Sequence, residues 1–168
     1  MILVGIGSNL PTEAYGPPRE TAKAAATALE KAGIRVRRQS RWYETAPVPV
    51  SDQPWYVNGV VEVETDLEPY ELLQALHRIE ADFHRVRTVR NASRTLDLDL
   101  LDYDGRLSGE ETGVILPHPR LHQRAFVLKP LAELAPGWRH PVTGTALEEL
   151  IRALPPEQIA HAIGPDSP

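Results

Sequence analysis

The stretch Thr-Leu-Asp-Leu-Asp-Leu at residues 95–100 alternates polar and apolar side chains at every position. This period of two predicts a β-strand whose leucines face a core and whose aspartates share the opposite side. Asp97 and Asp99 would then project side by side, roughly 6.5–7 Å apart along the strand. The stretch therefore predicts a half-buried strand that carries two neighbouring carboxylates.

The segments around this strand complete a recognisable order of elements. Apolar and β-branched residues predict three further strands, at 2–8, 34–45 and 56–64. Apolar residues at helical spacing predict helices at 20–32, 69–86, 124–134 and 146–154. The order β-α-β-β-α-β followed by extra helices predicts a ferredoxin-like α+β fold, with an antiparallel sheet, helices on both faces and additional C-terminal helices.

Length and composition indicate one globular domain. The 168 residues are 42% hydrophobic and 24% charged, which excludes wholesale disorder and fits a single domain over 1–168. We expect the tail from about residue 160 to be loose, because it ends in a Gly-Pro pair and a short polar run. No apolar run approaches the length of a membrane helix, and the first residues lack a basic leader, so we expect a cytoplasmic protein.

Cysteine usage and net charge exclude several classes of function. The chain has no cysteine, which excludes disulfides and thiol catalysis and leaves metal binding to carboxylates and histidines. The formal net charge of −5 argues against a nucleic-acid partner, because nucleic-acid-binding domains usually present a basic surface. We expect neither a nucleic acid nor a membrane as partner, and a monomer, with a dimer as the alternative.

Asp97 and Asp99 are the first candidates for chemistry. Two carboxylates on one side of a strand repel each other unless a cation lies between them. Their oxygen atoms suit Mg²⁺ that is also bound by nucleotide phosphates. The alternative is a solvent-exposed sheet face, on which acidic residues are ordinary. The spacing alone leaves both interpretations open.

A cluster of arginines precedes the aspartates within ten residues, at Arg85, Arg87, Arg90 and Arg94. A cationic loop that leads into a strand with two carboxylates matches the needs of phosphoryl transfer, in which a metal holds the oligophosphate and guanidinium groups offset developing charge. A solvated basic loop is the alternative, and for any one of the arginines it is the simpler explanation.

Two further titratable residues have both a structural and a functional interpretation. Glu80 falls on or beside the apolar stripe of the predicted helix 69–86, so its carboxylate needs a partner. That partner is either a structural one, Arg78 or Arg85, or a ligand. His118 lies between two prolines that hold it rigidly, which suits a hydrogen-bond donor to phosphate, although a lone histidine is more often structural.

The proline-rich loop at 46–54 ends in aromatic residues. Trp55 and Tyr56, together with Asn58, could stack on a flat heterocycle and hydrogen-bond to its edge. Packing of these side chains at the junction of loop and strand is the alternative. Gly5 and Gly7 follow neither the Walker A nor the Rossmann spacing, so they do not predict a phosphate loop.

The competing class of function is a non-catalytic ferredoxin-like module that binds RNA or senses a metabolite. The predicted strands lack the aromatic pattern of RNA-recognition motifs, and the acidic net charge disfavours RNA further. A metabolite sensor would have no need of paired aspartates beside an arginine cluster.

Five sequence blocks in a fixed order resemble one enzyme family. They are Gly-Ser-Asn-Leu at 7–10, Tyr-Glu-Thr at 43–45 with Asp-Gln-Pro at 52–54, Arg-Thr-Leu-Asp-Leu-Asp at 94–99, Pro-His-Pro at 117–119 and Arg-Ala-Phe at 124–126. Over about residues 2–137 the chain closely resembles the 6-hydroxymethyl-7,8-dihydropterin pyrophosphokinases of folate biosynthesis. The resemblance implies a ferredoxin-like fold and transfer of diphosphate from ATP to the hydroxymethyl group of the pterin, which yields AMP and the pterin diphosphate.

The resemblance also implies roles for individual residues. Asp97 and Asp99 would bind two Mg²⁺ ions that bridge the ATP phosphates, and Arg85 and Arg94 would act in catalysis from a loop. The residues implied for ATP are His77, Glu80, Arg87, Arg90, His118 and Arg124. The residues implied for the pterin are Thr45, Ala46, Val48, Tyr56, Asn58 and Phe126.

The chain departs from the family pattern at several positions. Asn-Ala-Ser at 91–93 replaces a common Trp-Gly-Pro and is one residue shorter. Ala46 stands where proline is common, and Pro119 replaces an aromatic residue. Gly113 and Ile115 stand where polar contacts to ATP can occur. The aspartate pair and both loop arginines are kept, so we expect the activity to be kept.

Overall fold

The structure is a computed structural model, which describes residues 1–84 and 95–164. Its helices and strands follow the predicted order, except that the predicted strand at 34–45 is divided in two and a short strand forms after the last helix. The elements are β1 (Ile2–Ser8), α1 (Pro18–Lys31), β2 (Arg35–Gln39), β3 (Tyr43–Thr45), β4 (Tyr56–Glu64), α2 (Pro69–His84), β5 (Asp97–Tyr103), α3 (Ala125–Leu134), α4 (Leu147–Arg152) and β6 (Ala160–Ala162). Two short 3₁₀ turns, Glu110–Thr112 and Leu121–Gln123, lie between β5 and α3.

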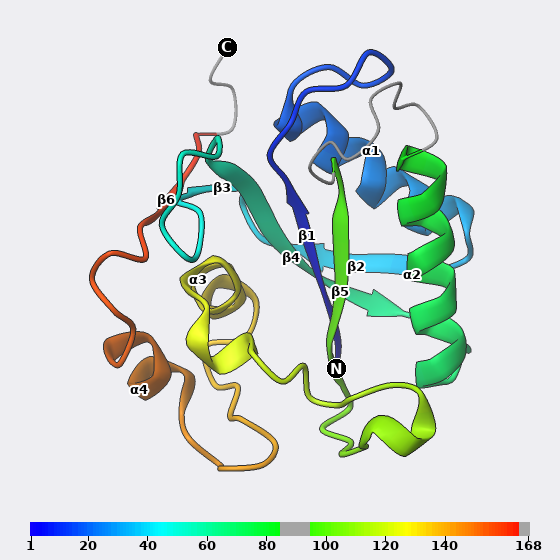
Figure 1. Cartoon of the computed structure of the whole chain (residues 1–168). Coiled ribbons are helices and arrows are strands. Elements are labelled where there is room, and N and C mark those ends of the chain that lie inside the picture. Colours follow the sequence, from blue (N-terminus) through cyan, green and yellow to red (C-terminus); the bar gives the residue numbers. More distant parts are fainter. Residues whose placement is uncertain (85–94, 165–168) are drawn as a thin grey trace.

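The strands form one antiparallel sheet of six strands. Their order is β5-β1-β4-β3-β6, and β2 pairs with β4 beside β3. Figure 1 shows α1 and α2 on one side of this sheet and α3 and α4 on the other. This arrangement confirms the predicted ferredoxin-like α+β fold with helices on both faces and extra C-terminal helices.

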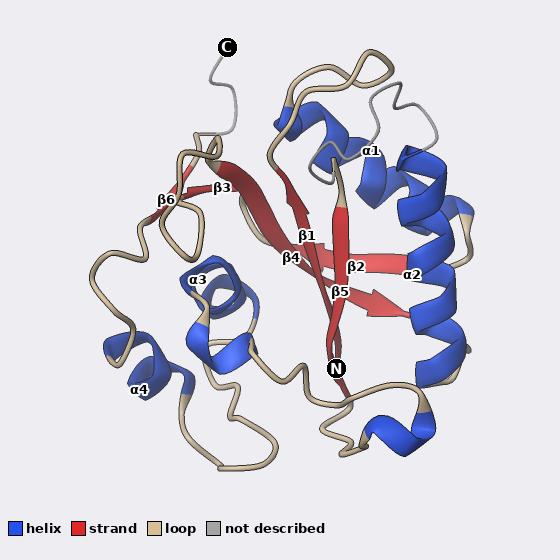
Figure 2. Cartoon of the chain, viewed as in Figure 1, coloured by secondary structure: helices blue, strands red, loops and turns tan. Residues whose placement is uncertain are grey.

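Each face of the sheet has its own hydrophobic core. Ile2, Val4 and Ile6 of β1 belong to the core under α1 and α2, whereas Leu3 belongs to the core under α3 and α4. This alternation follows from the period of two along a strand. In the secondary-structure view of Figure 2, the two helical layers enclose the central strands β1 and β4. Within the described ranges, none of the helices is both long enough and apolar enough to cross a membrane.

A β-bulge on β5 changes which side chains face α3. Leu3 pairs with Asp102 and Val4 with Leu100, so Leu101 is an extra residue in β5. Leu101 packs in the core under α3, and Asp102 accepts a hydrogen bond from Trp138 Nε1 of the same core (2.9 Å). The bulge therefore separates Asp102, which is tied into the core, from the two preceding aspartates of the strand.

The predicted strand at 34–45 is interrupted. It forms two strands, β2 and β3, and Ser40 lies at the break. The Ser40 N–H donates to the Val60 C=O (2.9 Å), while its Oγ accepts from the Val60 N–H (3.0 Å). Because a side-chain oxygen replaces the main chain as acceptor, the regular pairing with β4 is broken there.

Residues 160–163 differ from the loose tail that we expected from about residue 160. Ala160–Ala162 forms β6 and pairs with β3, and the Ile163 N–H donates to the Trp42 C=O (2.8 Å). The short Ala-His-Ala segment has little strand propensity of its own, so its conformation depends on this long-range pairing. The described part of the tail is thus held at the edge of the sheet through residue 163.

Glu133, near the end of α3, ties that helix to the segment before β3. Its carboxylate accepts hydrogen bonds from the Arg41 backbone N–H (2.8 Å), from Arg41 Nε (2.6 Å) and from the Tyr43 hydroxyl (2.9 Å). Burial by itself raises the pKa of the carboxyl, but these bonds outweigh burial and hold the pKa of Glu133 below its usual value. The charged carboxylate therefore adds stability above its unfolded-state pKa, and this stability is lost as the pH falls through the folded-state pKa.

We expect Glu133→Gln to lower the free energy of unfolding by about 1–2 kcal/mol at neutral pH, because it weakens bonds to a charged acceptor. The difference from the wild type should shrink as the pH is lowered from neutral through the folded-state pKa of Glu133, because the native carboxyl then becomes protonated as well. Urea unfolding at neutral pH and at a series of acidic pH values measures this. Glu148→Gln, at an exposed carboxylate of α4, is the control and should change little. A loss that is independent of pH would contradict the assignment.

Candidate active site

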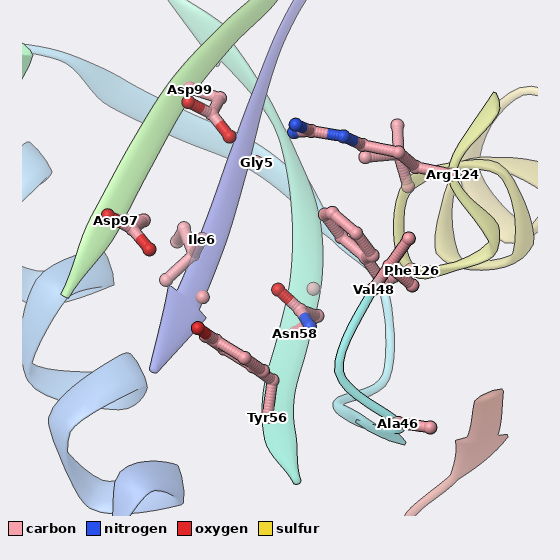
Figure 3. Close-up of a pocket in the computed structure, with 13 residues that line it drawn as sticks. Gly5, Ile6, Ala46, Val48, Tyr56, Asn58, Asp97, Asp99, Arg124 and Phe126 are labelled. Atoms are coloured by element: carbon pink, nitrogen blue, oxygen red, sulfur yellow. The ribbon is translucent and has the colours of Figure 1, made fainter. Parts of the chain in front are cut away.

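A cavity of about 180 Å³ opens on the α3 side of the sheet (Figure 3). Its floor is made by β1, β4 and β5, and its walls by the start of α3 and the loop after β3. Thirteen residues line it: Gly5, Ile6, Gly7, Ala46, Val48, Tyr56, Asn58, Gly59, Asp97, Asp99, Arg124, Phe126 and Val127. Carboxylates, an arginine, an amide and two aromatic rings therefore meet in one concave site.

Asp97 and Asp99 lie on the cavity side of β5, as their spacing predicts. Asp97 pairs with Gly7 of β1 and Asp99 with Gly5, so no side chain of β1 lies beside either carboxylate. Both aspartates are half-buried and line the cavity, which a freely solvated sheet face does not explain. The two carboxylates are drawn on the same side of the strand in Figure 3.

These carboxylates fit a metal ion that other ligands complete. Among residues 1–84 and 95–164, the Asp99 carboxylate has no hydrogen bond or ion pair to a protein group. The same residues contain no group of three or more histidine, cysteine or carboxylate side chains that could hold a metal by themselves. Mg²⁺ commonly binds one or two carboxylates together with substrate phosphates, and this donor set suits that mode.

Asn58 and Thr45 form a fixed polar pair at the opposite end of the cavity. Asn58 Nδ2 donates to Thr45 Oγ1 at 2.7 Å, and both residues are buried. This bond orients the Asn58 amide so that its Oδ1 lies over Gly7, where an added Cβ would come within 2.5 Å of it. Because Gly7 has no side chain, the Asn58 amide oxygen can occupy this space.

Aromatic side chains line the cavity from two elements. Tyr56 at the start of β4 and Phe126 in the first turn of α3 both reach it, and Figure 3 shows their rings on different sides of Asn58. Burial raises the pKa of the Tyr56 hydroxyl, and the negative charge of Asp97 raises it further. Trp55 is 41% exposed and does not line the cavity, so only part of the aromatic cluster predicted from the sequence is brought to the site.

Arg124, the residue immediately before α3, extends its side chain into the cavity. Its guanidinium points toward Asp99 in Figure 3, and its Cζ lies 5.2 Å from the centre of the Phe126 ring. Burial lowers the pKa of Arg124, although Asp99 and Asp97 oppose that shift. Arg124 thus provides a partly buried cation beside the carboxylate pair.

A second cavity of about 350 Å³ lies beyond the outer edge of β5 and is also lined by Asp99. It brings together His77 and Glu80 of α2 with His118 of the Pro-His-Pro turn. Its remaining walls are mostly apolar: Leu73, Leu98, Leu100, Gly113, Val114, Ile115 and Pro119. Asp99 therefore lies between two adjoining cavities of different character.

Glu80 has a structural partner that sequence reasoning missed. Its Oε2 accepts a hydrogen bond from the Leu98 N–H of β5 (3.1 Å), and the residue is 9% exposed. Because β5 lies at the edge of the sheet, no strand of the described residues pairs with it on that side. Glu80 thus supplies an acceptor to the sheet edge and lines the second cavity at the same time.

His118 is held in one orientation by its own turn. Its backbone N–H donates to the Leu101 C=O (2.9 Å), and its ring Nδ1 accepts from the Arg120 backbone N–H (3.1 Å). Burial lowers the pKa of His118, and Arg124 and Arg120 lower it further against the opposing effect of Asp99. The ring is therefore neutral near pH 7, with its proton on Nε2 as a hydrogen-bond donor.

Four predicted site residues lie outside the described part of the chain: Arg85, Arg87, Arg90 and Arg94. Of the other predicted residues, Thr45 supports the cavity through Asn58 without lining it. Gln53 is a contact that sequence reasoning missed, since its Oε1 lies 3.4 Å from both Asn9 Nδ2 and the Tyr56 hydroxyl. The Asp-Gln-Pro block was the sequence feature that marked this position.

The sequence of the chain is similar to that of one enzyme family and of several of its bacterial members. The family described as 7,8-dihydro-6-hydroxymethylpterin-pyrophosphokinase (HPPK) matches residues 3–136. A 2-amino-4-hydroxy-6-hydroxymethyldihydropteridine pyrophosphokinase of Pseudomonas aeruginosa is 42% identical over 164 residues, which cover 97% of each chain. The enzyme of the same name from Synechocystis is 41% identical over 150 residues, 89% of this chain and 73% of its own.

Solved structures share the fold at low sequence identity. The wild-type Plasmodium falciparum HPPK-DHPS, solved with pteroate, superposes with a TM-score of 0.67 at 12% identity. The match covers 90% of this chain, which spans only 41% of that longer protein. At this identity the likeness speaks for the fold alone, whereas the family match and the bacterial relatives speak for descent. The chain belongs to the 7,8-dihydro-6-hydroxymethylpterin-pyrophosphokinase family.

Proposed function

We propose that the two adjoining cavities are the active site of this pyrophosphokinase, which acts on 6-hydroxymethyl-7,8-dihydropterin in folate biosynthesis. The enzyme transfers diphosphate from ATP to the hydroxymethyl group and releases AMP. One observation carries the assignment of the site: Asp99 lines both cavities. The first is the one lined by Tyr56 and Phe126, called the aromatic cavity below, and the second is the one lined by His77 and Glu80 of α2, called the cavity beside α2. A transfer between two bound substrates needs such a shared boundary, where the donor phosphate and the acceptor hydroxyl meet.

The aromatic cavity is the proposed pterin site. Tyr56 and Phe126 would flank the flat ring, and Asn58 would hydrogen-bond to its edge through the oxygen that the bond to Thr45 orients. Ala46 and Val48 lie in the loop after β3, which forms one wall of the cavity. Their backbone groups and apolar side chains would contact the pterin from that wall. These residues cover the faces and part of the edge of a bicyclic heterocycle.

The cavity beside α2 is the proposed nucleotide site. His77 and Glu80 would contact the nucleoside, and the Nε2 proton of His118 would donate to a phosphate oxygen. Arg124 would neutralise phosphate charge from the other side of Asp99. We propose that Arg87 and Arg90 also bind ATP, and that Arg85 and Arg94 assist catalysis, from the segment that precedes β5 in the sequence.

Asp97 and Asp99 are the proposed metal ligands. We propose two Mg²⁺ ions, which when bound would offset the negative charge of the ATP phosphates and polarise them. The same-side carboxylates and the absence of a protein partner for Asp99 in the described ranges support this assignment. The two aspartates would hold the phosphates at the boundary between the cavities.

The proposed chemistry is an in-line displacement. The hydroxymethyl oxygen forms a bond to the β-phosphorus of ATP, the bond from that phosphorus to the oxygen of AMP breaks, and the hydroxyl proton passes to water. The protein contributes by positioning the substrates, by neutralising charge through Arg124, and by donating a hydrogen bond from the neutral His118 ring. We further propose that the protein works in the cytoplasm, without a nucleic acid or membrane partner. We also propose that it is a monomer; analytical sedimentation would reveal the alternative, a dimer.

We expect AMP to form from ATP only when both 6-hydroxymethyl-7,8-dihydropterin and Mg²⁺ are present. Chelation of the metal should abolish AMP formation, and renewed Mg²⁺ should restore it, because the phosphates need the cation to lie beside two carboxylates. Chromatographic separation of AMP from ADP measures the result. A pterin that lacks the hydroxymethyl group is the control. Formation of ADP instead of AMP would contradict diphosphate transfer.

A further inference from the structure

The segment after α4 contacts both walls of the aromatic cavity. Gln158 Oε1 accepts a hydrogen bond from the Ala125 N–H (2.9 Å), and Gln158 Nε2 donates to the Gln123 C=O (2.9 Å). The C=O of the next residue, Ile159, accepts from the N–H of Ala46, a cavity-lining residue of the opposite wall (3.0 Å). Two consecutive residues near the end of the chain thus bond to both sides of the site.

The Gln158 amide bonds to the peptide groups on either side of Arg124. Arg124 has an extended backbone, with φ −120° and ψ 112°. In an extended residue, the preceding C=O and the following N–H point to the same side, as they do toward a neighbouring strand. One primary amide, which has both a donor and an acceptor, can therefore pair with both groups. The side chain of Gln158 takes the place of a strand at this residue.

The main chain of Arg124 is itself bonded locally: its N–H donates to the Leu121 C=O (3.3 Å), and its C=O accepts from the Val127 and Leu128 N–H groups (3.1 and 3.0 Å). The Gln158 pairing adds the bonds to the two flanking peptide groups, and together these bonds set the direction from which the Arg124 side chain leaves the backbone. Arg124 precedes the first residue of α3 and makes no side-chain cap to that helix. Its guanidinium points into the cavity toward Asp99, over the ring of Phe126 (Figure 3). A rotation of the Arg124 backbone would move the guanidinium away from the phosphate position proposed above.

We propose that Gln158 is a positioning residue for diphosphate transfer and acts by fixing the backbone of Arg124. The inference rests on the proposed function, because it assumes that Arg124 contacts phosphate. It extends the site beyond residues 3–136, the region that the family match covers. It also gives the described segment after α4 a role in the reaction.

The segment that carries Gln158 is anchored independently of its amide. Ala160–Ala162 pairs with β3, and Ala160 packs in a small core with Tyr43 and Ala125. Removal of the amide therefore leaves Ala160–Ala162 in place, while it releases the Gln123 C=O and the Ala125 N–H on either side of Arg124. This separation allows a test in which the fold is kept.

Gln158→Met removes both hydrogen bonds and keeps the length of the side chain. We expect kcat to fall about tenfold or more, because small displacements of charged groups in an active site are costly, while the thermal midpoint changes by only a few degrees. Gln158→Glu keeps an acceptor for the Ala125 N–H but turns a carboxylate oxygen toward the Gln123 C=O. It should also lower kcat, and it replaces the first variant if that one does not fold. Glu157→Gln, at the exposed neighbouring residue, is the control and should keep the wild-type kcat.

A double-mutant cycle with Arg124→Ala separates positioning from a general loss of stability. If Gln158 acts through Arg124, Gln158→Met should lower kcat by less than about twofold in the Arg124→Ala background. A full additional tenfold loss there would overturn the inference, as would a wild-type kcat in both Gln158 variants. A wild-type kcat for Arg124→Ala would overturn it together with the role of Arg124. A wild-type protein that forms no AMP would contradict the proposed function before any variant is compared.

Discussion

Asp97→Asn and Asp99→Asn are each expected to lower kcat for AMP formation by about 10³-fold or more. Such a loss corresponds to about 4 kcal/mol of transition-state stabilisation, the scale of a lost electrostatic contact to a reacting phosphate. The amide keeps the shape of the carboxylate but removes the charge that balances a cation. Steady-state kinetics at saturating Mg²⁺ and both substrates measure the loss, and calorimetry of Mg²⁺-ATP binding should show weaker binding.

A third aspartate of the same strand provides the matched control. Asp102 is 4% exposed, and its two oxygens accept from Trp138 Nε1 and from the Gly105 N–H, each at 2.9 Å. Asp102→Asn leaves one of these donors without an acceptor, so it should cost about 1–3 kcal/mol of stability and leave kcat near the wild-type value. If Asp99→Asn behaved like Asp102→Asn, the carboxylate pair would be structural and the metal assignment would be wrong.

The strands that carry the site were predictable because their side-chain pattern is local. Strict alternation placed Asp97 and Asp99 on one side of β5 and Leu98 on the other, and the structure has this arrangement. The long apolar period of α2 likewise predicted the helix that carries Glu80. In each case the pattern repeats over several residues, so packing against a core determines the element.

The features that the sequence did not predict depend on contacts between distant residues. β6 forms because Ala160–Ala162 pairs with β3, although the segment has little strand propensity of its own. The Glu80 carboxylate bonds to the Leu98 N–H across 18 residues, and the Gln158 amide to the peptide groups around Arg124 across more than 30. No local period encodes such pairs, since each bond depends on where the rest of the fold brings its partner.

The close approach of β1 to the Asn58 amide also depends on a contact between distant residues. It explains why a glycine stands at position 7, although Gly7 fits no phosphate-loop spacing. Gly7 pairs with Asn58 of β4 and with Asp97 of β5, so it lies between the proposed pterin contact and the proposed metal ligand. An added Cβ at Gly7 would meet Asn58 Oδ1 at 2.5 Å, well inside van der Waals contact. The bond from Asn58 Nδ2 to Thr45 Oγ1 limits how far the amide can move away.

Gly7→Ala is therefore expected to raise KM for the pterin tenfold or more, because the displaced Asn58 oxygen can no longer face the ring edge and a lost or unpaired hydrogen bond costs about 1–3 kcal/mol. KM for ATP should change little, since the second cavity does not include Gly7. Overpacking should also cost about 1–3 kcal/mol of stability. Initial rates over a range of each substrate separate the two KM values. Gly137→Ala, where an added Cβ meets no atom within 4 Å, is the matched control. An unchanged pterin KM in folded Gly7→Ala would place the pterin elsewhere, because the substitution cannot leave the Asn58 amide where it is.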